Sequence, residues 1–200
     1  MNLTGITEFD EVLVKHFLDS LCCVKAVDMS NVKTVMDIGT GAGFPGVPLK
    51  IAFPEVEACL LDSLNKRVKF LEETFALLGL EGISAIHGRA EEYAKNKAYR
   101  EKYDLCVSRA VSGLATLSEY CLPYVKVGGL FVSYKSGSVK EEAEAAEKAV
   151  KILGGKIRDI QYFDLPGSEI GRSLVIIEKV KNTPGKYPRK AGTPLREPLA

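Results

Sequence analysis

A glycine-rich turn that directly follows an apolar, acid-containing segment constrains this chain more than any other feature. Residues 35–46 read Val-Met-Asp-Ile-Gly-Thr-Gly-Ala-Gly-Phe-Pro-Gly. Glycines let the backbone turn sharply and leave room for a ligand to lie against the peptide groups. Pro45 suits the first turn of a helix, whose free N–H groups would face the same place. The segment therefore predicts a strand, a turn and a helix that together bind a nucleotide or nucleoside cofactor.

The turn leaves two classes of cofactor open. Gly41, Gly43 and Gly46 fit the G-x-G-x-x-G pattern of dinucleotide-binding proteins, so a Rossmann-type oxidoreductase is an alternative. Asp37 precedes the turn, where a carboxylate would disfavour an anionic pyrophosphate and attract a cation. Asp62 ends the next expected strand, where an acid hydrogen-bonds ribose hydroxyls in either cofactor. The two acids favour S-adenosylmethionine, which has no phosphate and carries an ammonium and a sulfonium, although each could simply cap a turn or a helix.

Apolar periodicity predicts alternating strands and helices over most of the chain. Strands are expected at 34–38, 57–62, 83–87, 103–108, 130–135, 156–163 and 173–180, and the main helices at 8–24, 45–53, 65–78, 114–125 and 141–153. The joint between the last two strands is too short for a parallel crossover, so these strands should form a hairpin. The prediction is an α/β fold: a doubly wound, mostly parallel seven-stranded sheet with one antiparallel strand.

Three segments follow from this pattern. Residues 1–32 form an N-terminal helical extension, residues 33–180 the cofactor-binding domain, and residues 181–200 a basic, proline-rich tail. The tail holds five basic residues against one acidic residue. Its composition fits either a solubilising, disordered tail or an electrostatic arm for a polyanion.

Composition excludes several classes of protein. The 27 basic and 26 acidic residues nearly balance, so the chain is not a uniformly basic nucleic-acid binder, although a local basic patch is compatible with this total. The five cysteines are scattered without a Cys-x-x-Cys pair, which argues against a disulfide framework or a zinc site. No apolar run or N-terminal pattern indicates a membrane span or a secretory signal. We expect a cytoplasmic monomer without a metal or a membrane contact.

Candidate site residues stand where the expected strands end, because ligands of open α/β sheets bind beyond the carboxyl ends of the strands. Arg109 follows the fourth strand, where an arginine that only filled space would be costly. Lys135 follows the fifth strand and Arg172 precedes the last one, so both could face the site or be surface cations. Ala90 and Glu91 follow the third strand and could bracket an adenine, or simply begin a helix.

The chain resembles the RsmG (GidB) methyltransferases over essentially its whole length. The motifs that carry this resemblance, in order, are Asn2-Leu3-Thr4, His16-Phe17-Leu18-Asp19-Ser20, Asp37–Gly46, Leu61–Arg67, Ser108-Arg109-Ala110, Asn182-Thr183-Pro184 and Tyr187-Pro188-Arg189-Lys190. Members of this family usually carry a further helical segment before the Asn-Leu-Thr motif. The extension is therefore expected to be shortened relative to the family, which adds a catalytically silent cofactor-binding module as a third alternative.

The resemblance implies a class I, Rossmann-like methyltransferase that transfers a methyl group from S-adenosylmethionine to N7 of a guanine in small-subunit ribosomal RNA. The substrate would be the RNA or the small-subunit particle, and the second product S-adenosylhomocysteine. Guanine N7 carries a lone pair and no proton, so the transfer needs no general base. Arg109 and Lys135 are accordingly expected to position the reactants.

The expected site residues fall into two sets. The cofactor set is Asp37, Gly39, Gly41, Gly43, Phe44, Asp62, Ala90, Glu91 and Arg109. The RNA set is Lys66, Arg89, Lys135, Arg172, Arg189 and Lys190.

Overall fold

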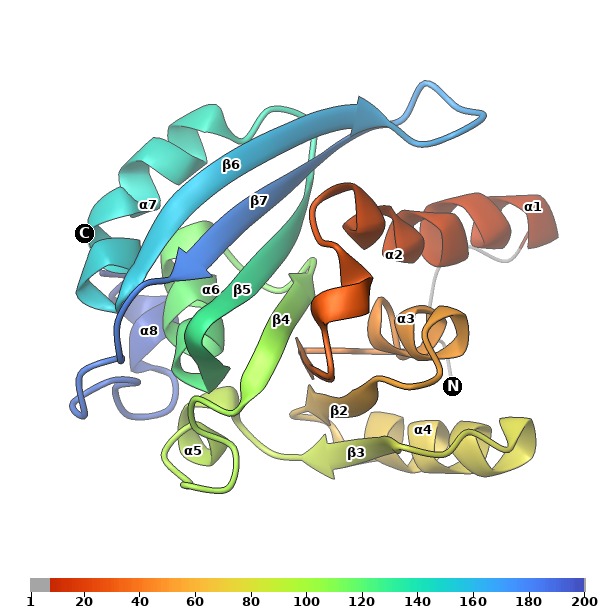
Figure 1. Ribbon diagram of the computed structural model, residues 1–200, viewed down its shortest axis with the longest axis horizontal. Helices are drawn as coiled ribbons and strands as arrows, with labels where there is room; N and C mark the ends of the chain where they lie inside the picture. Colours follow the sequence, from red (N-terminus) through yellow and green to blue (C-terminus); the bar gives the residue numbers. More distant parts are fainter. Residues whose placement is uncertain (1–7, 200) are drawn as a thin grey trace.

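A seven-stranded sheet lies between two layers of helices in the computed structural model, which describes residues 8–199 (Figure 1). The strands are β1 (Thr34–Ile38), β2 (Glu57–Asp62), β3 (Ile83–His87), β4 (Tyr103–Arg109), β5 (Val125–Ser136), β6 (Gly155–Asp164) and β7 (Gly171–Lys179). Their order across the sheet is β3-β2-β1-β4-β5-β7-β6. Only β7 runs antiparallel to its neighbours, β5 and β6. The predicted mostly parallel sheet with one antiparallel strand is confirmed.

The strand order reverses between β1 and β4. From β1 the chain moves outward through β2 to β3, and then returns to place β4 on the other side of β1. Loops that leave β1 and β4 therefore diverge, and ligands of open α/β sheets bind at such a point. The glycine turn follows β1, and Arg109 ends β4. The two strongest sequence features thus meet at the place where the topology opens a crevice.

Helices cover both faces of the sheet. One layer holds the N-terminal helical region together with α3 and α4; the other holds α5 to α8 (Figure 1). The elements of the first layer are α1 (Phe9–Val12), the π-helical stretch η1 (Leu13–Leu18), α2 (Asp19–Leu21), η2 (Cys22–Lys25), η3 (Met29–Asn31), α3 (Gly46–Ala52) and α4 (Asn65–Leu78). Those of the second are α5 (Ala90–Tyr93), α6 (Leu114–Cys121), η4 (Leu122–Tyr124), α7 (Lys140–Ile152) and α8 (Thr193–Arg196).

Alternating residues of the central strands enter two different cores. In β1, Val35 packs with the N-terminal helices and α3, whereas Met36 packs with α6 and α7. Both side chains are buried, because successive residues of a strand point to opposite faces. This two-sided burial explains the nearly continuous apolar runs of the parallel strands. On α4 the predicted apolar stripe is buried at Val68, Leu71 and Phe75, and the helix ends at left-handed Gly79 as expected.

Residues 181–199 pack against the domain, so the interpretation of the C-terminal segment as a disordered tail is wrong. Arg100 donates to the carbonyl oxygen of Tyr187 at 2.9 Å. Arg189 forms an ion pair with Glu119, whose side chain is almost completely buried. Composition misled here because it does not show that Arg189 pairs with a buried carboxylate of the domain, or that Arg100 of the domain binds carbonyl oxygens of the segment. At the other end of the chain, the Asn2-Leu3-Thr4 motif lies outside the described residues.

Candidate functional site

The glycine turn after β1 adopts the backbone that only glycine takes without strain. Gly39, Gly41 and Gly43 have φ values of 71°, 62° and 96°. A Cβ on Gly39 would stand 2.5 Å from the side chain of Val111, and one on Gly43 would stand 2.6 Å from Val47. The turn is therefore held closely between the start of α3 and the loop that follows β4.

Asp37 lies beneath this turn and fixes its shape. The side chain is fully buried, and its Oδ2 atom accepts hydrogen bonds from Thr40 Oγ1 at 2.7 Å and from the Gly46 backbone N–H at 2.9 Å. Burial raises the pKa of this carboxyl to about 6, while the two hydrogen bonds act in the opposite direction. Gly46 begins α3, so an internal carboxylate already holds the helix N-terminal N–H that a pyrophosphate would use.

Asp62 reaches the turn from the end of β2. Its Oδ2 atom accepts a hydrogen bond from the Gly41 N–H at 2.9 Å, and its Oδ1 atom accepts one from the Leu64 N–H at 2.9 Å. Arg67 approaches the same carboxylate at 3.3 Å. The acid is thus fixed at the edge of a cleft, where a free lone pair can accept from a ligand hydroxyl.

This cleft, called the turn cleft here, has a volume of about 340 Å³. It brings together predicted residues from the ends of three strands: Gly39, Asp62, Arg89, Ala90 and Glu91. The remaining lining comes from Ile38, Leu61, Ser63, Arg67, Gly88, Ala110, Val111, Ser112, Tyr120 and Leu195. Acids at one edge and apolar side chains along the walls suit a ligand that has both hydroxyl groups and a flat ring.

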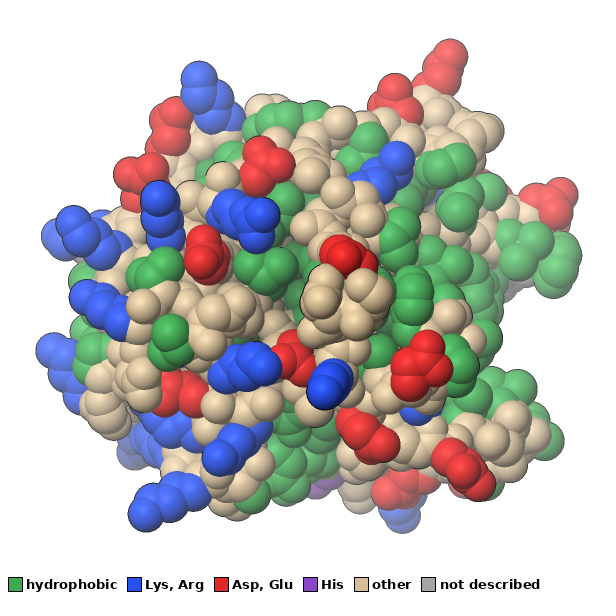
Figure 2. Space-filling model, in the orientation of Figure 1, with side chains coloured by type: hydrophobic (Ala, Val, Ile, Leu, Met, Phe, Trp, Pro, Cys, Tyr) green, Lys and Arg blue, Asp and Glu red, His purple; other side chains and the backbone are tan. Residues whose placement is uncertain are grey.

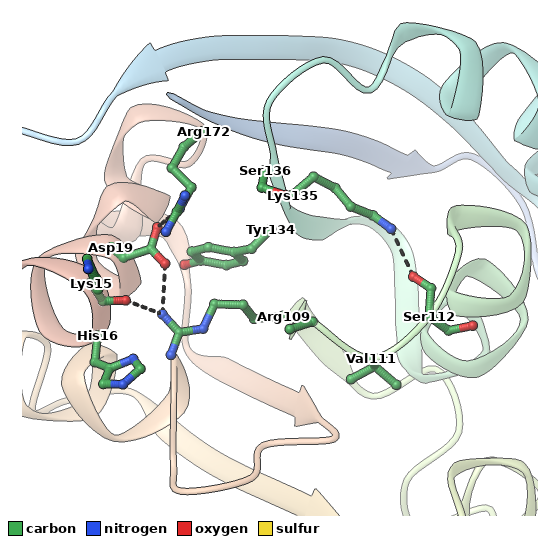
Figure 3. A pocket seen from close by; sticks show the side chains of 11 residues that line it. Lys15, His16, Asp19, Arg109, Val111, Ser112, Tyr134, Lys135, Ser136 and Arg172 are labelled. Carbon is green, nitrogen blue, oxygen red and sulfur yellow. Dashed lines mark hydrogen bonds and ion pairs between the residues drawn. The ribbon is translucent and has the colours of Figure 1, made fainter. Parts of the chain in front are cut away.

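A second pocket, whose lining is drawn in Figure 3, has a volume of about 550 Å³. It shares residues 110–112, the loop after β4, with the turn cleft. The second pocket is called the cationic pocket because four basic side chains line it against one acid, Asp19. Those basic residues are Lys15, Arg109, Lys135 and Arg172.

Asp19 joins two of these basic groups. Its Oδ2 atom accepts from Arg109 Nη1 at 2.9 Å, and its Oδ1 atom accepts from Arg172 Nε at 3.1 Å (Figure 3). The three residues come from α2, β4 and β7, and Asp19 itself is buried. The carboxylate therefore fixes both guanidinium groups at the wall of the cationic pocket.

The Phe44 side chain of the glycine turn lies next to this wall of the cationic pocket. Phe44, in the turn, stacks on His16 with ring centroids 5.0 Å apart, and the Arg109 guanidinium lies 5.4 Å from the centroid of the Phe44 ring. Burial, and next the nearby Arg109, lower the pKa of His16. The imidazole is thus neutral at pH 7 and packs as an aromatic surface.

Lys135 holds the loop that divides the two clefts. Its Nζ atom donates to the Ser112 carbonyl oxygen at 2.8 Å and to Glu142 Oε1 at 2.7 Å. The same Glu142 oxygen accepts from the Leu114 N–H, at the start of α6, at 2.7 Å. The lysine at the end of β5 therefore lines the cationic pocket and also fixes the loop after β4.

Other predicted residues lie apart from the two clefts. Lys66 is exposed on the first turn of α4 and lines neither cleft, and Lys190 is likewise exposed. Arg189 donates from its backbone N–H and its guanidinium to Glu119. Of the predicted RNA set, Lys135 and Arg172 line the cationic pocket, and Arg89 lines the turn cleft.

Several lining residues had no sequence signal of their own. Tyr120 and Val111 lie in ordinary helical and loop patterns, and Leu195 stands in a segment without periodicity. Asp19 and His16 entered the prediction only through a motif of the family resemblance. One local signal could have identified Asp19: it is an acidic residue next to apolar positions of the predicted N-terminal helix.

Residues 8–199 contain neither a metal-binding cluster nor a membrane-spanning helix. No group of three or more His, Cys, Asp and Glu side chains within residues 8–199 is arranged to hold a metal ion. None of the described helices has the length and apolar character needed to cross a membrane.

Solved structures with a similar fold include methyltransferases. The S-adenosylmethionine-dependent methyltransferase SibL superposes with a TM-score of 0.61 at 16% identity, over 82% of this chain and 55% of that chain. TrmN from Thermus thermophilus superposes with a TM-score of 0.55 at 16% identity, over 74% of this chain and 44% of that chain. At these identities the similarity shows the fold, which is that of class I methyltransferases.

Sequence relatives are far closer. The family model for rRNA small subunit methyltransferase G (GidB) matches residues 1–170. Ribosomal RNA small subunit methyltransferase G of Lachnoclostridium phytofermentans is 55% identical over all of this chain and 82% of its own length. The protein of the same name from Alkaliphilus metalliredigens is 53% identical over all of this chain and 83% of its own length. The resemblance seen in the motifs is confirmed, and the chain belongs to the rRNA small subunit methyltransferase G family.

Proposed function

We propose that this protein transfers a methyl group from S-adenosylmethionine to N7 of a guanine in small-subunit ribosomal RNA. The observation that carries the proposal is the contact between the turn cleft and the cationic pocket along residues 110–112. A methyl donor bound in the turn cleft would lie beside an RNA base bound in the cationic pocket. The family to which the chain belongs supports the same reaction, because its relatives are named as ribosomal RNA small subunit methyltransferases.

The turn cleft fits S-adenosylmethionine better than a dinucleotide. Asp62 provides a carboxylate for ribose hydroxyls, and Glu91 adds a second acid at the same cleft. The Gly46 N–H is taken by Asp37, so the start of α3 offers little to a pyrophosphate. Cationic, phosphate-free S-adenosylmethionine, when bound, supplies an electrophilic methyl group. Gly39, Phe44 and Arg109 border the place where the turn meets the cationic pocket, so we assign them to its methionine side.

The cationic pocket fits an RNA nucleotide. Arg109 and Arg172 point toward Asp19 at its wall, and Lys135 stands on the opposite side (Figure 3). Arginine and lysine donate to phosphate oxygens and to guanine O6, and both contacts would leave N7 free. The pocket therefore suits an anionic nucleotide whose reactive atom is an acceptor.

Positioning is the main task of the protein in this reaction. Guanine N7 attacks with its own lone pair and loses no proton, so none of the cleft residues has to act as a base. Arg109 and Lys135 hold the base and its phosphates, and the loop 110–112 sets the distance between the clefts. Well-aligned reactants in a fixed geometry account for large rate gains without acid–base chemistry.

Further basic residues extend the RNA-binding surface in this proposal. Figure 2 shows Lys and Arg side chains gathered over α7 and the C-terminal residues. Exposed Lys66, Arg89 and Lys190 are assigned to phosphate contacts outside the pocket, which strengthen binding without reading sequence. We expect the protein to act as a monomer on RNA or on the small-subunit particle, in the cytoplasm where ribosomes are made.

Methylation of defined RNA tests the proposal. The protein is incubated with S-adenosylmethionine and either free small-subunit rRNA or small-subunit particles from cells that lack the modification, and the RNA is then mapped by mass spectrometry. One added methyl group at N7 of a single guanine is expected. A methyl group on another atom, or a protein that binds NAD and not S-adenosylhomocysteine in calorimetry, would contradict it.

A further inference from the structure

The C-terminal segment 189–197 lies at the edge of the turn cleft. Its short helix α8 lies against α6 (Figure 1). Leu195 of α8 lines the cleft together with Tyr120 of α6. Leu195 is 62% exposed. An exposed leucine on the wall of a cleft provides apolar surface that a ligand can cover.

The Arg189 side chain connects the two ends of this segment, and a buried carboxylate holds Arg189 in place. Glu119 is fully buried and accepts from the Arg189 N–H at 2.7 Å and from its guanidinium at 2.7 to 3.1 Å. At the other end, Arg189 also donates to the Glu197 carbonyl oxygen at 2.7 Å. A bidentate pair with a buried carboxylate holds a backbone far more firmly than a surface ion pair does.

Two more contacts hold the middle of the segment beside the cleft. The Gly192 N–H donates to Glu91 Oε1 at 2.8 Å, and Thr116 Oγ1 donates to the Pro194 carbonyl oxygen at 3.1 Å. Glu91 is itself a lining residue of the turn cleft, whereas Thr116 is buried behind it. Two residues just before Leu195 are therefore held, Gly192 by the cleft wall itself and Pro194 by the helix behind it.

We propose that the segment 189–197 is part of the cofactor site, with Leu195 as the wall against the adenine of S-adenosylmethionine. This inference rests on the proposed function for its ligand. Asp62 sets the ribose at one edge of the cleft, which directs the base toward Ala90, Val111 and Leu195. An adenine ring has two apolar faces. A leucine that packs against one of these faces removes apolar surface of the ring and of its own side chain from water.

The contacts favour this role over that of an electrostatic arm. Arg189 forms an ion pair with Glu119 of α6. The Nε and Nη2 atoms of Arg189 already donate within the protein, to Glu119 and to the Glu197 carbonyl oxygen. Arg189 thus anchors the segment beside the turn cleft, whereas the exposed Lys190 is left for contacts with RNA.

Calorimetry with S-adenosylhomocysteine and with adenosine tests the inference on the full chain. Leu195→Ala should weaken both ligands about ten-fold, since the lost contact is with the base they share. Leu77→Ala, at an 87% exposed leucine on α4, is the matched control and should change neither. Unchanged affinity in Leu195→Ala would overturn the inference. Failure of the wild type to bind S-adenosylhomocysteine would instead count against the proposed function.

A second pair of variants tests the anchoring. Thr116→Val keeps the side-chain volume but removes the donor to Pro194, and should weaken both ligands about five-fold. Ser118→Ala removes a buried hydroxyl of the same helix that donates only to Leu114, and should leave affinity unchanged. Equal effects of the two variants, or an RNA affinity that falls while S-adenosylhomocysteine affinity does not, would reject the role of the segment in the cofactor site.

Discussion

Asp19 and Arg109 form an ion pair of 2.9 Å that links the N-terminal helical region to the end of β4. The other oxygen of Asp19 accepts from Arg172, so a single buried carboxylate sets two guanidinium groups. Tyr134, on β5, reinforces this attachment by donating to the Ser20 carbonyl oxygen at 2.7 Å. The N-terminal helices are therefore a structural part of the cationic pocket.

Replacing Asp19 tests this dependence. Asp19→Asn leaves one acceptor and places an amide N–H₂ against a guanidinium, so either Arg109 or Arg172 must turn away. We expect kcat/KM for RNA to fall about ten- to hundred-fold, because removing one partner of a buried charge pair is costly. Asp10→Asn, on exposed α1, is the control, and steady-state methylation assays give the comparison. Equal kinetics in the two variants would show that Asp19 does not position the arginines.

Alanine variants at two glycines of the turn distinguish the effect of backbone strain from the effect of a steric contact. Gly39 and Gly41 both have positive φ, but a Cβ meets Val111 only at Gly39. Both alanine variants should lose roughly 1 kcal/mol of stability through strain. Gly39→Ala should in addition displace Val111, which lines both clefts, and weaken S-adenosylhomocysteine binding about ten-fold more than Gly41→Ala does. Equal binding by the two variants, measured by calorimetry, would contradict the role given to Val111.

Local patterns in the sequence predicted the strands of the sheet, but they did not predict which residues line the two clefts. β1, β2 and β3 begin and end where the apolar runs predict, because strands buried on both faces need continuous apolar residues. β5 begins earlier than predicted, at Val125, since Val125 pairs with Tyr103 of β4 before a register shift leads to the pair of Leu130 and Leu105. Tertiary pairing, which is not local, determined that boundary.

Long-range contacts explain what the prediction missed at the site. Arg109 was identified because the end of a strand is a local feature, whereas its partner Asp19 is 90 residues away in sequence. Leu195 and Glu91 are brought together through Gly192, and neither periodicity nor composition reports such a pairing. The positive charge of the C-terminal segment suggested a flexible arm, because a sequence does not show that Arg189 has a buried carboxylate to bind.

The pH dependence of stability tests the environment of Asp37. Burial raises its pKa from 3.8 to about 6, so between these values the folded protein binds more protons than the unfolded chain does. The free energy of unfolding of the wild type minus that of Asp37→Asn should therefore decrease as pH rises from 4 to 6, by about 3 kcal/mol in total. Urea unfolding of both proteins at several pH values measures this difference.

Asp28 provides a control of opposite sign. Hydrogen bonds from Ser30, its side chain first and then its backbone N–H, lower the pKa of Asp28. The stability of wild type relative to Asp28→Asn should then increase with pH, over a range at and below the ordinary pKa of an aspartate. If both differences changed with pH in the same direction, the assignment for Asp37 would be wrong.

Lys179, at the end of β7, anchors the start of the C-terminal segment from inside the protein. Its side chain is fully buried, and Nζ donates to Thr183 Oγ1 at 2.6 Å, while Glu101 lies 3.3 Å away. Lys179→Met would leave these acceptors buried without their donor. We expect the free energy of unfolding to fall by about 3 kcal/mol, and limited proteolysis to cut within residues 181–199 sooner than in wild type.

The same lysine makes a prediction at high pH. Burial lowers the pKa of Lys179 to about 8, although Glu101 acts to raise it. Between that value and the ordinary 10.5 the unfolded chain binds the proton that the folded protein has released. The stability of wild type relative to Lys179→Met should therefore increase as pH rises from 8 to 10.5, since the neutral amine keeps its hydrogen bonds and no longer incurs the cost of a buried charge. Urea unfolding at pH 7.5 and 9.5 tests this, and a difference that stays constant between these two values would show that Lys179 keeps its charge because Glu101 outweighs its burial.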